Sequence, residues 1–187
     1  LQLGERHSCL LTENGSAFCW GGNDRGQLGL GNTTNSNSPL QITLPSQRSI
    51  IELRTGYEHN CALYDNYSVA CWGSNDFAQL GMGLGTDRNI ATPVVPLGSS
   101  VQSVSVGMDH SCAIMNSSEL KCWGRNDGGQ LGIGNDNTRT QIQDPNLDSD
   151  LLVIAVGLGD YHTCVVTNST TDFSENGSIY CWGWNGF

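Results

Sequence analysis

Apolar and polar residues alternate in short runs along this chain, and this pattern predicts β-strands without a helix of regular period. Val101–Val106 alternates and predicts one strand, and His110–Met115 predicts a second. Glu119–Trp123 predicts a third strand after a short turn. A fourth strand is expected after each glycine-rich loop, in the segments Pro39–Leu44, Pro93–Leu97 and Gln141–Asp144. The predicted fold class is therefore all-β, with antiparallel strands.

One block of residues occurs four times, and this repeat predicts the architecture. The first cysteine of each block is Cys9, Cys61, Cys112 or Cys164, so the steps are 52, 51 and 52 residues. Periods near this length are typical of the blades of a β-propeller. We therefore expect four antiparallel strands in each unit. The units are predicted at approximately residues 1–50, 51–100, 101–150 and 151–187, with the last one incomplete.

Each block also carries a Trp-Gly pair followed by a glycine-rich stretch with the sequence Gln-Leu-Gly. This pattern spans Trp20–Gly31, Trp72–Gly83 and Trp123–Gly134, and it begins again at Trp182. The units resemble the repeats of the regulator of chromosome condensation family, and the resemblance covers the whole chain. It implies a ring of about seven blades, so four units predict an open arc or part of a larger ring. Residues 1–187 are therefore expected to be a single repeat domain within a longer protein.

Eight cysteines recur with the repeat, two in each unit. The pairs are Cys9 and Cys19, Cys61 and Cys71, Cys112 and Cys122, and Cys164 and Cys181. Each pair is predicted to lie on adjacent strands of one hairpin, where cross-strand neighbours are close enough for a disulfide. Buried free thiols, or a metal site that includes the histidine two residues earlier, are the alternatives. A spacing of ten differs from the short cysteine spacings of structural zinc sites, so four disulfides are expected.

Disulfides persist in oxidising compartments. We therefore expect the protein to be extracellular, either secreted or on a cell surface.

Histidine and tryptophan recur at fixed places, two residues before the first cysteine and directly after the second. These residues are His7, His59, His110 and His162, and Trp20, Trp72, Trp123 and Trp182. Repetition in every unit predicts structural roles, in which each imidazole bonds backbone in a neighbouring turn and each indole packs between blades. Trp184 stands outside this pattern and is a candidate exposed contact. No Ser-His-acid set stands out and no carboxylate pair is signalled, so no enzymatic activity is expected.

The charge of the chain narrows the classes of partner. A formal net charge of −10 argues against nucleic acid, because binding to phosphates depends on Lys and Arg. An anionic membrane would be repelled for the same reason, and no apolar run approaches the roughly 20 residues that span a bilayer. The glycine-rich stretch Gly132–Asp136 has neither the lysine of a phosphate loop nor the acidic ladder of calcium repeats. No cofactor or metal is therefore expected.

Six Asn-x-Ser/Thr triplets without proline make the chain a candidate glycoprotein. They begin at Asn14, Asn32, Asn66, Asn116, Asn168 and Asn176. Five of the six lie between the paired cysteines of a unit, which places them near the tip of the same hairpin in successive blades. If these sites carry sugar, one side of the array is coated and partners use the opposite face or the outer rim. Asparagine also favours turns, so accidental triplets are the alternative.

Three functions fit these patterns. The first is an extracellular, non-enzymatic scaffold that binds a protein or glycan, and similar repeats with cysteines are found in the ectodomains of plant Crinkly-type receptor kinases. The second is a structural component of an extracellular fibre, wall or appendage that self-associates through open blade edges. The third is nuclear guanine-nucleotide exchange on a Ran-type GTPase, which the family resemblance implies and which the expected disulfides and sugars oppose.

Overall fold

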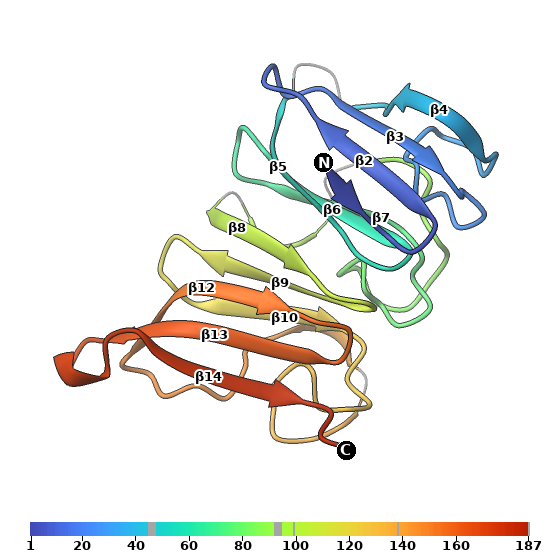
Figure 1. The fold of residues 1–187 in the computed structure, drawn as a ribbon. Helices are drawn as coiled ribbons and strands as arrows, with labels where there is room; N and C mark the ends of the chain where they lie inside the picture. The colour runs from blue at the N-terminus through green and yellow to red at the C-terminus, as the bar shows by residue number, and fades with distance from the viewer. Residues whose placement is uncertain (45–47, 92–94, 99, 138, 187) are drawn as a thin grey trace.

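The computed structural model describes residues 1–44, 48–91, 95–98, 100–137 and 139–186. These residues form four antiparallel sheets, one for each unit, which lie side by side in chain order (Figure 1). Units 1 and 4 lie at opposite ends of the array. In the described part of the chain, no helix is long and apolar enough to cross a membrane. The all-β prediction is confirmed.

Units 1 and 3 have four strands each in the described residues. Unit 1 contains β1 (Gln2–Leu3), β2 (His7–Leu11), β3 (Ala17–Gly21) and β4 (Ser36–Gln41), and unit 3 contains β8 (Val101–Val106), β9 (His110–Met115), β10 (Leu120–Gly124) and β11 (Arg139–Gln143). β8 and β9 have the predicted bounds, and β10 begins one residue later than expected. β4 begins earlier and ends earlier than expected, because Ser36 pairs with Gly21 across a shift in register.

Units 2 and 4 have three strands each in the described residues. Unit 2 contains β5 (Ile50–Thr55), β6 (His59–Tyr64) and β7 (Val69–Gly73), and unit 4 contains β12 (Leu151–Leu158), β13 (His162–Ser169) and β14 (Ser178–Gly183), with a single 3₁₀ turn, η1 (Phe173–Glu175), between the last two. The strand predicted at Pro93–Leu97 falls partly outside the described residues, and residues 95–97 are not in a strand.

The hydrophobic core lies between consecutive units. One buried cluster, for example, combines Cys61, Cys71 and Leu80 of unit 2 with Val104 and Trp123 of unit 3. Equivalent clusters join units 1 and 2 and units 3 and 4. Each blade therefore depends on its neighbour for burial, as expected for stacked repeats.

The strands fix two opposite faces of the array. The hairpins β2–β3, β6–β7, β9–β10 and β13–β14 end on one side, at the left in Figure 1, and we call this side the hairpin face. The turns that enter β2, β6, β9 and β13 lie at the other ends of the strands, beside the glycine-rich loops that follow β3, β7 and β10. We call this second side the turn face.

Candidate functional site

A disulfide joins the two central strands of every unit. The cysteines are direct cross-strand partners, with Cα atoms 4.2 Å apart in Cys9–Cys19 and 4.1 Å apart in Cys61–Cys71, Cys112–Cys122 and Cys164–Cys181. The first three disulfides are fully buried, and the fourth is partly exposed at the end of the array. The four bonds join the pairs that the repeat predicts, and the described residues contain no free cysteine.

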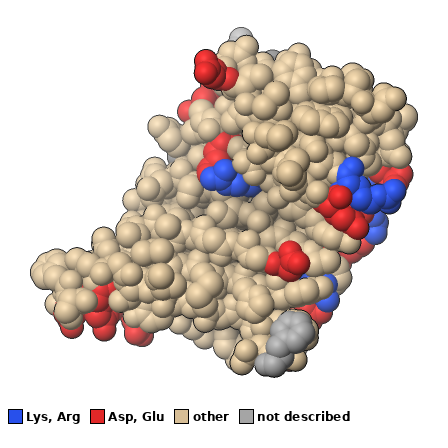
Figure 2. Space-filling model, viewed as in Figure 1, with Lys and Arg blue, Asp and Glu red and all other residues tan. Residues whose placement is uncertain are grey.

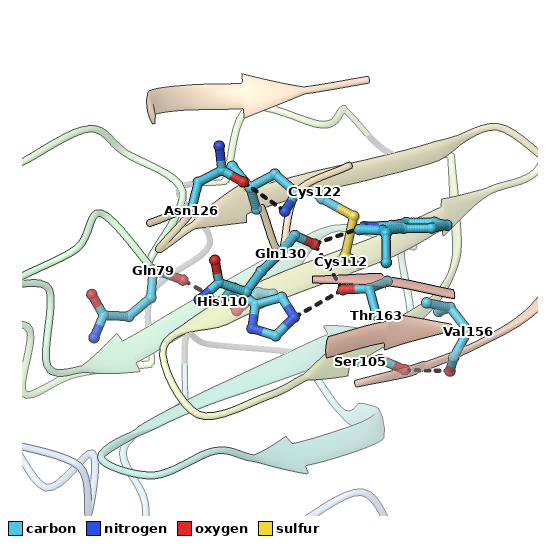
Figure 3. Close-up of a disulfide and its surroundings, with 12 residues drawn as sticks. Gln79, Ser105, His110, Cys112, Cys122, Asn126, Gln130, Val156 and Thr163 are labelled. Carbon is cyan, nitrogen blue, oxygen red and sulfur yellow. Dashed lines mark hydrogen bonds between the residues drawn. A yellow bond between two sulfur atoms is a disulfide. The ribbon is translucent and has the colours of Figure 1, made fainter. Parts of the chain in front are cut away.

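A hydrogen-bonded joint lies beside each buried disulfide and connects its unit to the next one, and Figure 3 shows the joint beside Cys112–Cys122. Between units 3 and 4, the Thr163 hydroxyl donates to the Gln130 carbonyl at 2.9 Å, and Trp182 Nε1–H donates to the same carbonyl at 2.8 Å. His110 Nε2 lies 2.9 Å from Thr163 Oγ1. Because the hydroxyl hydrogen is already used on Gln130, the imidazole must donate from Nε2. One chain of hydrogen bonds thus links two blades.

The same joint recurs between the other units with a different middle residue. Ser111 takes that place between units 2 and 3, where it lies 2.9 Å from His59 Nε2 and donates to the Gln79 carbonyl at 3.2 Å. Asn60 takes it between units 1 and 2, where its Oδ1 lies 3.0 Å from His7 Nε2. We expected the histidines to bond backbone directly. Instead, the Nε2 atoms of His7, His59 and His110 bond a side chain of the next unit, which relays the contact to a backbone carbonyl.

Residues of the repeat at the two ends of the array are less enclosed than those in the middle. Trp72 and Trp123 are buried between units, whereas Trp20 is half-buried and His162 is exposed. The reason is geometric: each joint forms between two consecutive units, and within residues 1–187 units 1 and 4 have a neighbour on one side each.

Burial controls the protonation of the two middle histidines. It lowers the pKa of His59 to about 3, with a further lowering by the nearby His110 and His7. It lowers the pKa of His110 to about 4. Both imidazoles are therefore neutral at pH 7, and neither is accessible to a substrate. These side chains act as joints between blades.

The glycine-rich loops are organised by a buried Asn and a buried Gln. In unit 3, Asn126 Oδ1 accepts from the Leu131 N–H at 2.9 Å, and its Nδ2 donates to the Asn135 carbonyl at 2.9 Å. Gln130 Oε1 accepts from the Gly128 N–H at 2.8 Å. These roles were not predicted, because Asn, Asp and Gly in the stretch are also typical turn formers. The signal was present, since an Asn and a Gln recur four residues apart at 23 and 27, 75 and 79, and 126 and 130.

Among the described residues, no group of three or more His, Cys, Asp or Glu side chains is arranged so that it could hold a metal ion.

Four of the predicted glycosylation triplets lie at the hairpin face. Asn14, Asn116 and Asn176 are exposed, and Asn66 is half-buried. Asn14 Oδ1 accepts from the Thr12 hydroxyl and the Ser16 N–H, which fixes the asparagine in the turn.

The remaining two triplets differ from these. Asn168 is half-buried near the end of β13, and its Oδ1 accepts from the Gly177 N–H at 3.1 Å. Asn32 is exposed in the glycine-rich loop after β3, on the other side of the sheet from the hairpins.

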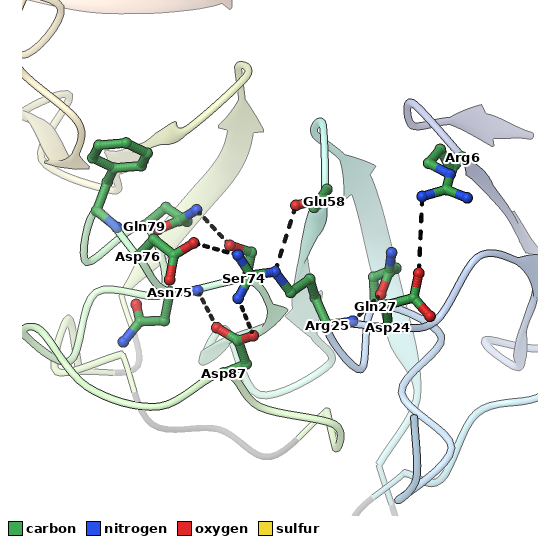
Figure 4. Close-up of polar contacts among 11 residues, drawn as sticks. Arg6, Asp24, Arg25, Gln27, Glu58, Ser74, Asn75, Asp76, Gln79 and Asp87 are labelled. Atoms are coloured by element: carbon green, nitrogen blue, oxygen red, sulfur yellow. Dashed lines mark hydrogen bonds and ion pairs between the residues drawn. The ribbon is translucent and has the colours of Figure 1, made fainter. Parts of the chain in front are cut away.

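On the face drawn in Figure 2, charged side chains are sparse and occur as small groups separated by wide uncharged areas. On the turn face, Arg25 joins units 1 and 2, because it approaches Glu58, Asp76 and Asp87 (Figure 4). Burial raises the pKa of the Glu58 carboxyl, and the nearby carboxylates of Glu5 and Asp109 raise it further against the lowering by Arg25. Three carboxylates thus surround one arginine at this contact between units 1 and 2.

The turns themselves surround a hollow, which we call the axial pocket because all four units contribute to its lining. It has a volume of about 270 Å³ and is lined by residues from all four units, among them Glu5, Tyr57, Met108 and Asp160. Interaction with Glu5, burial and the charges of nearby carboxylates together raise the pKa of the Tyr57 hydroxyl to about 12. The lining contains carboxylates and no Lys or Arg.

A second hollow of about 270 Å³, which we call the aromatic pocket, lies beside it between units 3 and 4. Its lining is Arg125, Asp127, Gly128, Tyr161 and Trp184. Trp184, which the sequence set apart from the repeat, is 41% exposed here. The turn face thus offers two adjacent pockets, one acidic and one aromatic.

Comparison with known families gives a match over most of the chain. The model of the "Regulator of chromosome condensation (RCC1) repeat" matches residues 14–63, 68–114 and 121–166. A second model of the same description matches residues 101–130.

Individual proteins and structures agree with this result. The ultraviolet-B receptor UVR8 of Arabidopsis thaliana is 30% identical over 186 residues, which cover 98% of this chain and 41% of that protein. Human WBSCR16 has the same fold, with a TM-score of 0.80 at 22% identity over 97% of this chain and 48% of that one. The ectodomain of the Physcomitrella patens receptor kinase CR4 aligns with a TM-score of 0.56 at 24% identity, over 98% and 39% of the two chains. The chain thus spans less than half of these proteins.

Proposed function

Because this chain belongs to the RCC1 repeat family, whose model matches most of its length, we propose that it is a secreted or cell-surface scaffold that binds a protein partner without catalysis. The observation that carries the proposal is the disulfide in the centre of every unit. Such bonds are rare in the reducing cytosol and nucleus and persist in secreted proteins. They support an extracellular role over nuclear nucleotide exchange.

The placement of polar groups supports a binding role. The buried His, Asn and Gln side chains of the repeat are engaged in joints and loops, where they hold the blades together. Scaffolds of this kind present their function on exposed loops. The two pockets of the turn face lie among such loops and turns.

The candidate glycans indicate which face is available. Sugars on Asn14, Asn66, Asn116 and Asn176 would cover the hairpin face and leave the turn face open. Asn32 lies on the loop after β3 in unit 1, away from the aromatic pocket between units 3 and 4. We therefore propose that the partner docks on the turn face.

Proximity labelling on intact cells that express the full-length protein tests both parts of this proposal. Asp160→Lys reverses an exposed charge of the axial pocket, and Glu13→Lys makes the same reversal at an exposed residue of the hairpin face without altering the Asn14 triplet. The expected result is labelling of cell-surface or secreted proteins that Asp160→Lys reduces and Glu13→Lys preserves.

Three results would contradict the proposal. The first is a full-length protein found reduced in the cytosol or nucleus. The second is acceleration of nucleotide release from a Ran-type GTPase. The third is the reverse pattern of labelling, in which only Glu13→Lys causes a loss.

A further inference from the structure

The aromatic pocket is built by residues from two units that come together on the turn face. Tyr161 lies in the turn between β12 and β13, and Trp184 directly follows β14. The backbone N–H of Trp184 donates to the Tyr161 carbonyl at 3.0 Å. The two aromatic rings pack edge to face, with their centroids 5.8 Å apart. Arg125 and Asp127 of unit 3 also line the pocket. The lining therefore combines aromatic and charged side chains.

The rings at this site already hold one guanidinium group of the chain. Arg125 lies over the ring of Phe77, 4.7 Å from its centroid, and over the ring of Tyr161 at 5.3 Å. Cations within about 6 Å of an aromatic face are attracted by the electrons of the ring. The environment thus suits a planar cation.

The charge of Arg125 is more than balanced by its neighbours. Its Nη2 and Nε contact both oxygens of Asp127 at 2.7 Å, and its Nη1 lies 3.3 Å from Asp109. Asp160 adds a further exposed carboxylate directly before Tyr161. Asp109 and Asp127 thus contact Arg125, and Asp160 adjoins Tyr161 in the chain, so three carboxylates accompany one arginine in this region.

We infer that the aromatic pocket receives an arginine or lysine side chain of the protein partner, and that the flanking segment of the partner crosses the acidic axial pocket. This inference rests on the proposed docking at the turn face. A cation in the pocket contacts the exposed Trp184 ring and lies close to Asp127, which also lines the pocket. A neutral residue of the same size gains neither the ring attraction nor the ion pairing. The net charge of −10 also favours approach of a basic partner.

The full-length protein labelled with 5-fluorotryptophan provides a direct test by fluorine NMR. The Trp184 signal is assigned with Trp184→Phe, and the buried Trp72 and Trp123 serve as internal references. The probes are N-acetyl-arginine amide, N-acetyl-lysine amide, N-acetyl-glutamine amide and methyl β-glucoside. We expect the two cations to shift the Trp184 signal saturably, about fivefold more tightly than glutamine, which corresponds to about 1 kcal/mol for an exposed cation–π contact.

Two variants separate this pocket from general surface charge. Tyr161→Leu removes an aromatic wall and is expected to weaken arginine binding about fivefold. Tyr67→Leu removes an exposed aromatic ring from the turn between β6 and β7 on the hairpin face, and it is expected to leave binding unchanged. Raising the salt concentration is expected to weaken the binding of the two cationic probes and to leave the binding of N-acetyl-glutamine amide unchanged.

Equal binding of arginine and glutamine would overturn the inference, as would arginine binding that Tyr161→Leu leaves intact. A saturable shift with methyl β-glucoside alone would show a glycan site instead. Failure of all four probes, together with loss of labelled partners in Asp160→Lys, would refute the cation pocket and leave docking on the turn face standing.

Discussion

Replacing Ser111 with alanine removes the middle member of the joint between units 2 and 3. The Ser111 hydroxyl lies 2.9 Å from His59 Nε2 and donates to the Gln79 carbonyl at 3.2 Å, and both Ser111 and His59 are completely buried. Gln79 keeps one partner in the variant, because Trp123 Nε1–H donates to the same carbonyl at 2.8 Å. The His59 N–H loses its acceptor in a dry site.

A buried donor without a partner costs about 1–3 kcal/mol, so we expect Ser111→Ala to lower the free energy of unfolding by that amount. The assay is urea unfolding of the full-length protein at pH 7, followed by the fluorescence of the buried tryptophans. Ser111→Thr and Ser111→Asn are the matched controls, because Thr163 and Asn60 occupy the same place in the other joints. Both controls are expected to have a free energy of unfolding closer to that of the unmodified protein than Ser111→Ala has.

A double-mutant cycle isolates the hydrogen bond from the change in packing. His59→Leu removes the donor, so Ser111→Ala should cost less in that background. Equal losses in Ser111→Ala and Ser111→Thr, or equal costs of Ser111→Ala with and without His59, would refute the role assigned to the joint.

Three further outcomes follow from the same structure. Folding lowers the pKa of His59 from about 6.5 to about 3 and that of His110 from about 6.5 to about 4. The stability of the folded protein is therefore highest above pH 6.5 and falls as the pH decreases toward 4, by about 3 kcal/mol for His110 alone. Urea unfolding at several pH values should show this loss, His110→Gln should reduce its slope, and a flat profile would contradict it. Reduction of Cys112–Cys122 opens a loop of about 11 residues and should lower stability by about 3 kcal/mol, and an unchanged melting temperature after complete reduction would show that the bond contributes little. Asn126→Ala should cost at least about 1–3 kcal/mol, because it leaves the Leu131 N–H and the Asn135 carbonyl without that partner, and a neutral effect in urea unfolding would contradict the assigned loop role.

The sequence predicts the strands well where they contain buried positions and poorly where nearly every position is exposed. β8 and β9 have the expected bounds, because buried positions in the middle of the array impose a clear pattern. β4 is almost entirely exposed, so its residues carry no alternation, and its start at Ser36 was missed. The disulfide pairs were accessible because the repeat restricts the 105 connectivities that eight cysteines allow.

The joints and pockets were harder to predict. The middle residue of the joint is Asn60, Ser111 or Thr163, and these share a hydrogen-bonding role without sharing a residue type. The aromatic pocket combines Tyr161 and Trp184 with residues of another unit, and only the fold brings them together. Trp184 was set apart by its place outside the repeat, but its neighbours carried no comparable signal.

Peptide mapping of the full-length protein, isolated from its natural source without reduction, tests the extracellular scaffold most directly. The account predicts disulfide-linked peptides within each unit and N-linked glycans on Asn14, Asn66 and Asn116 at the hairpin face. Free thiols at the paired cysteines, together with unmodified asparagines at these three positions, would contradict it.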